Sequence, residues 1–251
     1  MSDTPGPVVH VRPYVHELPG SKALHFSISE MQSRMRTDDP VALDLEYTRT
    51  MMGFLLFHPE PARLVMIGLG GGSLAKFCFR HLPQTRIEVV EINPHVIALR
   101  DEFTVPADDH RFQVVQADGA SFVRQRYTHC EVLMVDGFDD QGLPAPLCSQ
   151  RFYDDCSALL SVPGLLVANL PRGDRLFEIH LDRIRRSFGD AVLVVDGSDG
   201  GNSVVFASHA PLLPALRAVD GRLPKAPDRD WASPLNDRFE AIRSELRLRC
   251  C

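Results

Sequence analysis

The stretch Arg63 to Ser73, RLVMIGLGGGS, determines the predicted fold. Its first half is a continuous apolar run, typical of a parallel strand that is covered on both faces. Its second half, Gly68 to Ser73, is rich in glycine, and residues 73–82 have the pattern of a helix. Because glycines allow a tight turn and leave backbone N–H groups open, this strand, turn and helix predict a ligand site.

Outward from this stretch, strand-like and helix-like segments alternate along the chain. The further predicted strands are 86–92, 111–117, 131–135, 164–170, 191–195 and 203–208. The further predicted helices are 94–103, 119–126, 149–160, 174–188 and 236–249. This alternation predicts an α/β fold with a doubly wound, mostly parallel sheet of seven strands that ends in an antiparallel pair. Residues 209–235, rich in proline and charge, are expected to be an irregular surface segment.

The N-terminal part has a different pattern. Short β-like runs at Val8 to Val15 and Ala23 to Ser29, separated by turn residues, predict a small antiparallel cap. The densely apolar segment Glu46 to Phe57 predicts a buried helix. We therefore expect a β-strand cap over residues 1–46 and one α/β domain over residues 47–251.

The composition excludes several classes of protein. The chain has 251 residues, of which 44% are hydrophobic and 24% charged, as in an ordinary globular protein. A formal net charge of -6 provides no basic face for nucleic acid. The sequence contains neither a secretory signal nor an apolar run long enough to span a membrane, so we expect a cytoplasmic protein that binds neither membrane nor nucleic acid.

Cysteine and histidine patterns predict no metal site. The six cysteines are scattered, and the ten histidines form no ligand motif. Cys250 and Cys251 end the chain; they form either a redox-active or metal-capturing pair or an exposed, fraying tail.

Acidic residues stand at the carboxyl ends of two of the predicted strands. In open α/β sheets, ligands bind beyond these ends. Glu91 follows Gly70 by 91 − 70 = 21 residues, a spacing that lets a carboxylate accept both hydroxyls of a ribose. The alternative for Glu91 is a solvated strand end. Asp118, before Gly119, could accept from the amine of an adenine or cap the following helix.

A further acidic pair, Asp136 and Asp139, follows the strand 131–135. Two carboxylates three residues apart can converge on one cationic group, and one of them can take a proton. The alternative is an ordinary polar turn.

Four segments follow one another in the order RLVMIGLGGGSL, IEVVEINPHVI, VVQADGASFV and VLMVDGFDDQGLPAPLCSQRFYDDC. As an ordered set they resemble the spermidine synthase family of aminopropyltransferases, within the wider methyltransferase fold. The similarity covers roughly residues 25–170. The resemblance implies that the domain over residues 47–251 is a methyltransferase-like Rossmann domain.

The family resemblance also implies the ligands and the site residues. The co-substrate would be decarboxylated S-adenosylmethionine or S-adenosylmethionine, and the acceptor a small amine such as putrescine. Asp136 would be the general base and Asp139 would help to bind the amine; a homodimer is implied as well. The residues expected to bind the co-substrate are Gln32, Gly68, Gly70, Gly71, Gly72, Glu91, Asp118 and Gly119.

Two departures from the family pattern leave alternatives open. Ser73 and Leu74 stand where typical members have an Asp that meets the aminopropyl group, and TRTMMGFLLF (residues 48–57) lacks a usual acidic pair. The alternatives are a methyltransferase that uses S-adenosylmethionine on another acceptor, and a nucleoside-binding homologue without catalysis. Glu46 and Tyr47 are expected to start a buried helix, or else to take part in the site.

Overall fold

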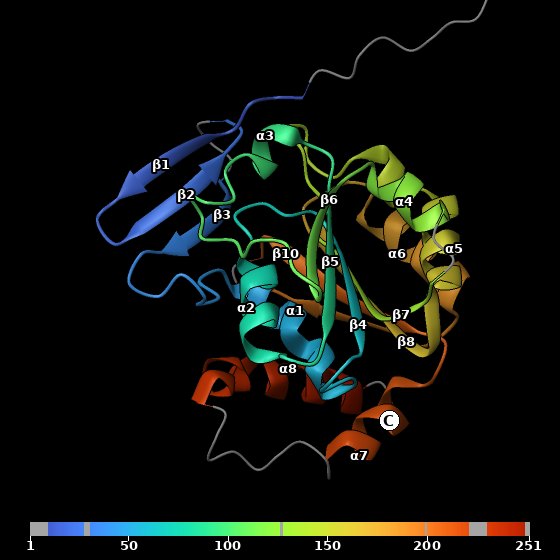
Figure 1. Ribbon diagram of the computed structural model, residues 1–251. Coiled ribbons are helices and arrows are strands. Elements are labelled where there is room, and N and C mark those ends of the chain that lie inside the picture. The colour runs from blue at the N-terminus through green and yellow to red at the C-terminus, as the bar shows by residue number, and fades with distance from the viewer. Residues whose placement is uncertain (1–9, 28–30, 126–127, 199, 221–229, 249–251) are drawn as a thin grey trace, which may run out of the picture.

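Seven strands form one sheet in the computed structural model, which describes residues 10–27, 31–125, 128–198, 200–220 and 230–248 (Figure 1). The strand order is β6-β5-β4-β7-β8-β10-β9. The first five strands of this order are parallel, and β10 is antiparallel to β8 and β9. The strands are β4 (Arg63–Ile67), β5 (Arg86–Glu91), β6 (Phe112–Gln116), β7 (Cys130–Val135), β8 (Leu160–Pro171), β9 (Val192–Asp196) and β10 (Asn202–Ser208). The predicted fold class is confirmed.

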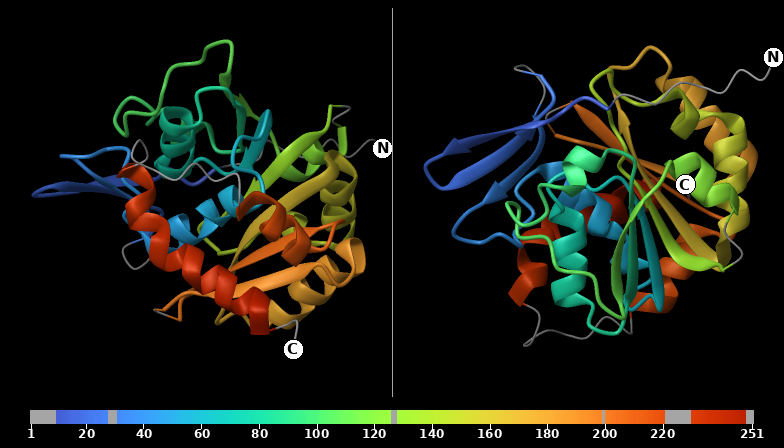
Figure 2. Two further views of the ribbon diagram at one scale, coloured as in Figure 1. Left: turned by 90° about the horizontal axis from the view of Figure 1, so that it is seen from below. Right: turned by 45° about the horizontal axis from the view of Figure 1, so that its top comes forward.

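Helices cover both faces of this sheet. The helices are α1 (Glu46–Met51), α2 (Ser73–His81), α3 (Pro94–Ile97), α4 (Gly119–Gln125), α5 (Gln150–Leu159), α6 (Phe177–Phe188), α7 (Leu212–Asp220) and α8 (Asn236–Leu248), with 3-10 turns at Met52–Leu56, Ala145–Cys148 and Asp230–Leu235. Figures 1 and 2 show α1, α2 and α8 on one face, and α4, α5 and α6 on the other.

The apolar run of β4 explains this layered packing. Leu64 and Met66 belong to the core under α1, α2 and α8, whereas Val65 and Ile67 belong to the core under α4, α5 and α6. Successive side chains of a strand point to opposite faces, so a strand with a layer of helices on each side needs apolar residues at every position.

The N-terminal sheet has three strands where two were expected. They are β1 (Tyr14–Leu18), β2 (Ser21–His25) and β3 (Met31–Arg36), in the order β1-β2-β3. The first strand begins at Tyr14, whereas Val8 and Ser29, the outer ends of the two expected strands, lie outside the described residues. The third strand was missed because its two buried positions hold Ser33 and Met35, so apolar and polar residues do not alternate.

Two helical predictions are corrected. The segment expected to be a helix over 94–103 is helical only to Ile97, and Phe103 and Val105 are both buried behind the glycine loop. After Ala98 the N–H groups of Leu99 and Arg100 bond three residues back, to Val96 and Ile97, so the chain continues in turns and not as an α-helix. The segment 209–235, expected to be irregular, contains α7, whose Pro214 falls in the first turn, where proline is tolerated.

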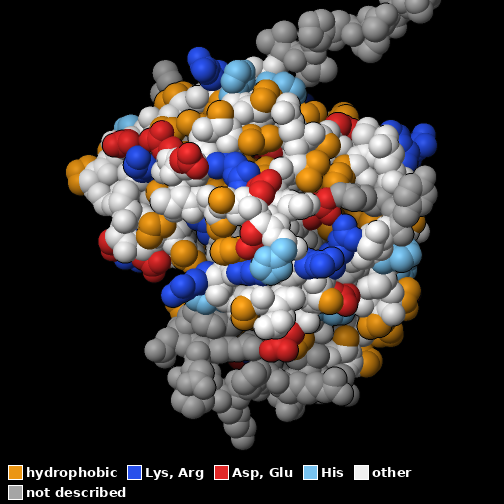
Figure 3. Space-filling model, in the orientation of Figure 1, with side chains coloured by type: hydrophobic (Ala, Val, Ile, Leu, Met, Phe, Trp, Pro, Cys, Tyr) orange, Lys and Arg blue, Asp and Glu red, His pale blue; other side chains and the backbone are white. Residues whose placement is uncertain are grey.

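The surface is mixed in charge. On the face shown in Figure 3, acidic side chains are interspersed with basic ones. None of the helices in the described ranges is both long enough and apolar enough to cross a membrane. Cys250 and Cys251 lie outside the described residues.

The packing of α8 yields a test of the fold. Ile242 is fully buried and fits over Gly53, where a side chain would collide with it. Ile242→Ala should lower the free energy of unfolding by about 2–5 kcal/mol, because it removes buried methyl groups and leaves a cavity. Urea unfolding followed by circular dichroism measures this. Ser244→Ala, at an exposed position of the same helix, is the control and should change it by less than about 0.5 kcal/mol; equal effects would contradict the packing.

Candidate active site

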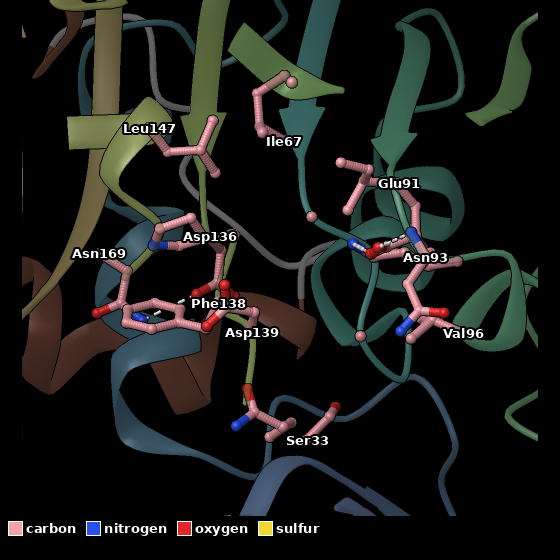
Figure 4. A pocket seen from close by; sticks show the side chains of 18 of the residues that line it. Ser33, Ile67, Glu91, Asn93, Val96, Asp136, Phe138, Asp139, Leu147 and Asn169 are labelled. Carbon is pink, nitrogen blue, oxygen red and sulfur yellow. Dashed lines mark hydrogen bonds between the residues drawn. The ribbon is translucent and has the colours of Figure 1, made fainter. Parts of the chain in front are cut away.

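A cavity of about 710 Å³ lies at the carboxyl ends of β4, β5, β7 and β8 and is also lined by residues of β2 and β3. Figure 4 shows part of its lining, with Glu91 and Asn93 on one side and Asp136 and Asn169 on the other. The residues predicted to form a site that line it are Gln32, Gly68, Gly70, Glu91, Asp118, Gly119, Asp136 and Asp139.

Gly71 and Gly72, which were predicted to bind the co-substrate, are not among the lining residues. A side chain at Gly71 would meet Ser33 and Phe103, and one at Gly72 would meet Val105. Gly72 has a φ of 69° and is the N-cap residue that precedes α2. These two glycines face the protein behind the loop, so only part of the glycine stretch is open to the cavity.

Gly68 joins the two sides of the cavity. Its φ is 99°, and a Cβ there would collide with the backbone of Asp136 and Gly137. The Gly68 N–H donates to Val90 O at 2.8 Å, and the Asp136 N–H donates to Ile67 O at 2.8 Å. Only glycine permits this backbone conformation together with so close an approach. The loop after β4 is therefore fixed to the strands on both of its sides.

Glu91 is buried, with 9% of its surface exposed, so it is not a solvated strand end. Its Oε2 accepts from Leu69 N–H at 2.9 Å, and its Oε1 accepts from Asn93 N–H at 2.8 Å. Burial raises the pKa of Glu91, and the backbone N–H groups oppose that rise. The carboxylate thus holds the glycine loop, and each oxygen keeps a lone pair for a further donor.

Asp118 performs the helix-cap role that the sequence allowed. Its Oδ1 accepts from Ser121 N–H at 2.8 Å at the start of α4. The residue also lines the cavity, so the cap does not exclude a contact with a ligand. The predicted contact with an adenine stays a prediction.

Asp136 is held on both of its carboxylate oxygens. Oδ1 accepts from Asn169 Nδ2 at 2.8 Å, and Oδ2 accepts from the Tyr47 hydroxyl at 3.2 Å. Burial raises the pKa of Asp136, while these two donors lower it. Burial and the neighbouring carboxylate also raise the pKa of the Tyr47 hydroxyl, so it stays protonated as a donor.

Tyr47 and Asn169 extend the predicted site. Tyr47 lies in the first turn of α1, as expected, but its side chain lines the cavity as well. Asn169 was missed by sequence reasoning, although it is a polar residue near the end of the apolar strand β8. That position, buried and at the carboxyl end of a strand, is the signal that could have identified it. Its Oδ1 is buried and has no hydrogen-bond partner among the residues that the structure describes.

Glu46 has a structural role. It does not line the cavity, and it binds the backbone and side chain of Ser198 and the guanidinium of Arg238. The sequence-based expectation that Glu46 starts a helix is correct.

The cavity has an acidic lining. Asp139 Oδ1 accepts from Gln141 N–H at 2.7 Å in the loop after β7, and its side chain lines the cavity beside that of Asp140. The acidic lining residues are Glu91, Asp118, Asp136, Asp139 and Asp140, and the described lining includes no Lys or Arg. Such a lining favours a positively charged ligand. Nowhere in the described ranges do three or more potential ligands gather in a group that could hold a metal ion.

The strand order and a cavity beyond the strand ends define a protein with a methyltransferase-like Rossmann fold. Residues 44–172 match the family model of the spermine/spermidine synthase domain. The chain belongs to the spermine/spermidine synthase family.

Comparisons with individual known proteins support this family assignment. The chain is 36% identical over 222 residues to a polyamine aminopropyltransferase of Chromobacterium violaceum, covering 84% of this chain and 85% of that one. It is 37% identical over 188 residues to one of Neisseria meningitidis serogroup A, covering 74% and 72%. A spermidine synthase solved with the transition-state analogue AdoDATO shares the fold, with a TM-score of 0.61 and 20% identity over 94% of this chain and 89% of that one.

The contacts of Glu91 yield a test of the nucleoside side. Glu91→Gln should weaken binding of methylthioadenosine about tenfold or more, because an amide nitrogen replaces one acceptor oxygen and the charge is lost. Isothermal titration calorimetry measures the affinity. Glu88→Gln is the control, since Glu88 lies on the same strand but pairs with Arg63 outside the cavity. Unchanged affinity in Glu91→Gln would exclude Glu91 from the ligand site.

Proposed function

We propose that this protein transfers an aminopropyl group from decarboxylated S-adenosylmethionine to a small amine such as putrescine, with Asp136 as the general base. The observation that carries the proposal is the partly buried carboxylate of Asp136, held by Tyr47 and Asn169 within an acidic cavity of the family's domain. The names of the relatives, polyamine aminopropyltransferases, support the same reaction.

The cavity suits two cationic co-substrates. Its volume of about 710 Å³ lies within the range of ligand pockets. The open part of the glycine loop, Glu91, Asp118 and Gly119 would hold the adenosyl group, and Gln32 would contact the tail of the co-substrate. When bound, decarboxylated S-adenosylmethionine supplies an alkyl carbon activated by a positively charged sulfur. The acidic lining favours this charge and the charge of an amine alike.

Asp136 would remove the proton that blocks attack by the amine. An ammonium group has no free lone pair, so a proton must leave before nitrogen can form a bond to carbon. That proton passes to Asp136; nitrogen bonds to the activated carbon, and the carbon–sulfur bond breaks with its electrons on sulfur. The balanced products are the extended amine and methylthioadenosine. Because burial raises the pKa of Asp136, it is a stronger base than an ordinary aspartate.

Tyr47 and Asn169 would fix the direction of the base. Each donates to one carboxylate oxygen, so the group cannot rotate freely. Asp139 and Asp140 would attract the remaining positive charge of the acceptor.

Methyl transfer from S-adenosylmethionine is the second candidate function. Ser73 lines the cavity where typical family members have an Asp that meets the aminopropyl group. An uncharged residue there removes a reason for excluding the carboxylated co-substrate. We also propose that the protein is a cytoplasmic homodimer, and that the boundary between its N-terminal cap and its α/β domain lies at residue 46.

The two candidates differ in the co-substrate that binds. Decarboxylated S-adenosylmethionine should raise the melting temperature more than S-adenosylmethionine at equal concentration, since a ligand that binds the native state stabilises it. Putrescine and the decarboxylated form together should yield methylthioadenosine, detected by chromatography. Stabilisation by S-adenosylmethionine alone would favour the methyltransferase, and binding without turnover in an amine screen would favour a homologue without catalysis.

A substitution tests the proposed base. Asp136→Asn should lower turnover at least a hundredfold, because an amide cannot take the proton, while affinity for methylthioadenosine stays within about twofold. Stopped assays give turnover and calorimetry gives affinity. Asp182→Asn, at an exposed position of α6 outside the cavity, is the control and should retain most of the turnover. Normal turnover in Asp136→Asn would remove Asp136 from the base role.

A further inference from the structure

One carboxylate outside the cavity joins three elements that are distant in the sequence. Glu46 Oε1 accepts from Ser198 N–H at 2.8 Å and from Arg238 Nη1 at 2.6 Å, and Oε2 accepts from the Ser198 hydroxyl. Glu46 begins α1, Ser198 lies in the turn between β9 and β10, and Arg238 lies on α8. Figure 2 (left) shows α8 beside α1. We call these three residues the Glu46 cluster.

The Glu46 cluster is partly shielded from water. The side chains of Glu46 and Arg238 are 20% and 21% exposed. Hydrogen bonds to Ser198 and the charge of Arg238 keep the pKa of Glu46 below its usual range, against the effect of burial. A partly buried ion pair with extra hydrogen bonds is stronger than an exposed one.

The start of α1 depends on contacts of this kind. The helix has six residues, and Leu45, which precedes it, makes no side-chain cap. A helix this short is not stable by itself. Within the segment, Arg49 Nη1 donates to the carbonyl oxygens of Leu43 and Asp44. Glu46 supplies the attachment of the first turn to the β9–β10 turn and to α8.

The residue after Glu46 is Tyr47, which contacts the proposed base. The distance of 3.2 Å from the Tyr47 hydroxyl to Asp136 Oδ2 is longer than the usual range of about 2.5–3.0 Å for O–H···O hydrogen bonds. A displacement of the first turn by less than about 1 Å is therefore enough to break this contact. The backbone at Glu46 and the side chain of Tyr47 share that turn.

We propose that Glu46 is a positioning residue: with Ser198 and Arg238 it fixes the first turn of α1 and so keeps the Tyr47 hydroxyl on Asp136. This role rests on the proposed function. It makes the β9–β10 turn and α8 parts of the active-site structure, although Ser198 and Arg238 do not line the cavity.

A double-mutant cycle tests the proposal. Glu46→Ala and Tyr47→Phe should each lower kcat about tenfold, and the double variant should be no worse than Tyr47→Phe, because both changes remove the same contact. The KM for the co-substrate should change less than about twofold. Glu88→Ala is the matched control: it also removes a carboxylate paired with an arginine, at 2.7 Å, but lies outside the cavity. It should leave kcat within about twofold.

The pH profile supplies a readout that general destabilisation would not move. The Tyr47 hydroxyl lowers the pKa of Asp136, so loss of the contact should raise that pKa. The acid limb of kcat should shift to higher pH in Glu46→Ala and in Tyr47→Phe, with no further shift in the double variant. Additive losses in kcat, or an unshifted limb in Glu46→Ala, would overturn the proposal.

Two further measurements separate a failure of the Glu46 proposal from misfolding of a variant and from failure of the proposed function. If Glu46→Ala does not fold, Arg238→Met replaces it in the cycle, because it breaks the cluster from the side of α8. If the wild-type protein turns over no amine, the proposed function fails. The role of Glu46 is then decided by carbon-13 NMR titration of Asp136, whose pKa should rise equally in Glu46→Ala and Tyr47→Phe; an unchanged titration in Glu46→Ala would refute it.

Discussion

The close backbone approach between Gly68 and Asp136 is the constraint on which the site depends. It fixes the loop after β4 to the end of β7, while the Gly68 N–H binds the end of β5. The distance between the proposed nucleoside side and the proposed amine side of the cavity is therefore fixed. Transfer between two bound molecules requires such a spacing, since reacting atoms must be held within a few tenths of an ångström of the productive geometry.

Around this constraint, charge and burial act together on Asp136. Its carboxylate is buried enough for its pKa to rise, and two neutral donors hold it in one orientation. Neutral donors stabilise a carboxylate without supplying a positive charge that would repel an amine. The other acids of the cavity supply the attraction. In the proposed reaction, the site would thus bind a cation and still contain a group able to remove its proton.

Much of this arrangement could be predicted from the sequence, because it depends on local patterns. The apolar run before Gly68, the spacing to Glu91 and the acids after the strand 131–135 each follow from strand ends meeting at one edge of a sheet. Asn169 also stands near a strand end, but Tyr47 could not be placed in the same way. The contact of Tyr47 with Asp136 spans 89 residues, so it depends on how distant elements pack. The third strand of the cap was not predicted because its buried Ser33 interrupts the alternation of apolar and polar residues.

The hydrogen bonds of Glu91 have one more consequence. Its carboxylate binds Leu69 N–H and Asn93 N–H, so contacts within the protein itself hold the shape of the glycine loop. A preorganised loop loses little conformational entropy on association. For the proposed nucleoside ligand, the free energy of its contacts would then be available for discrimination between similar molecules.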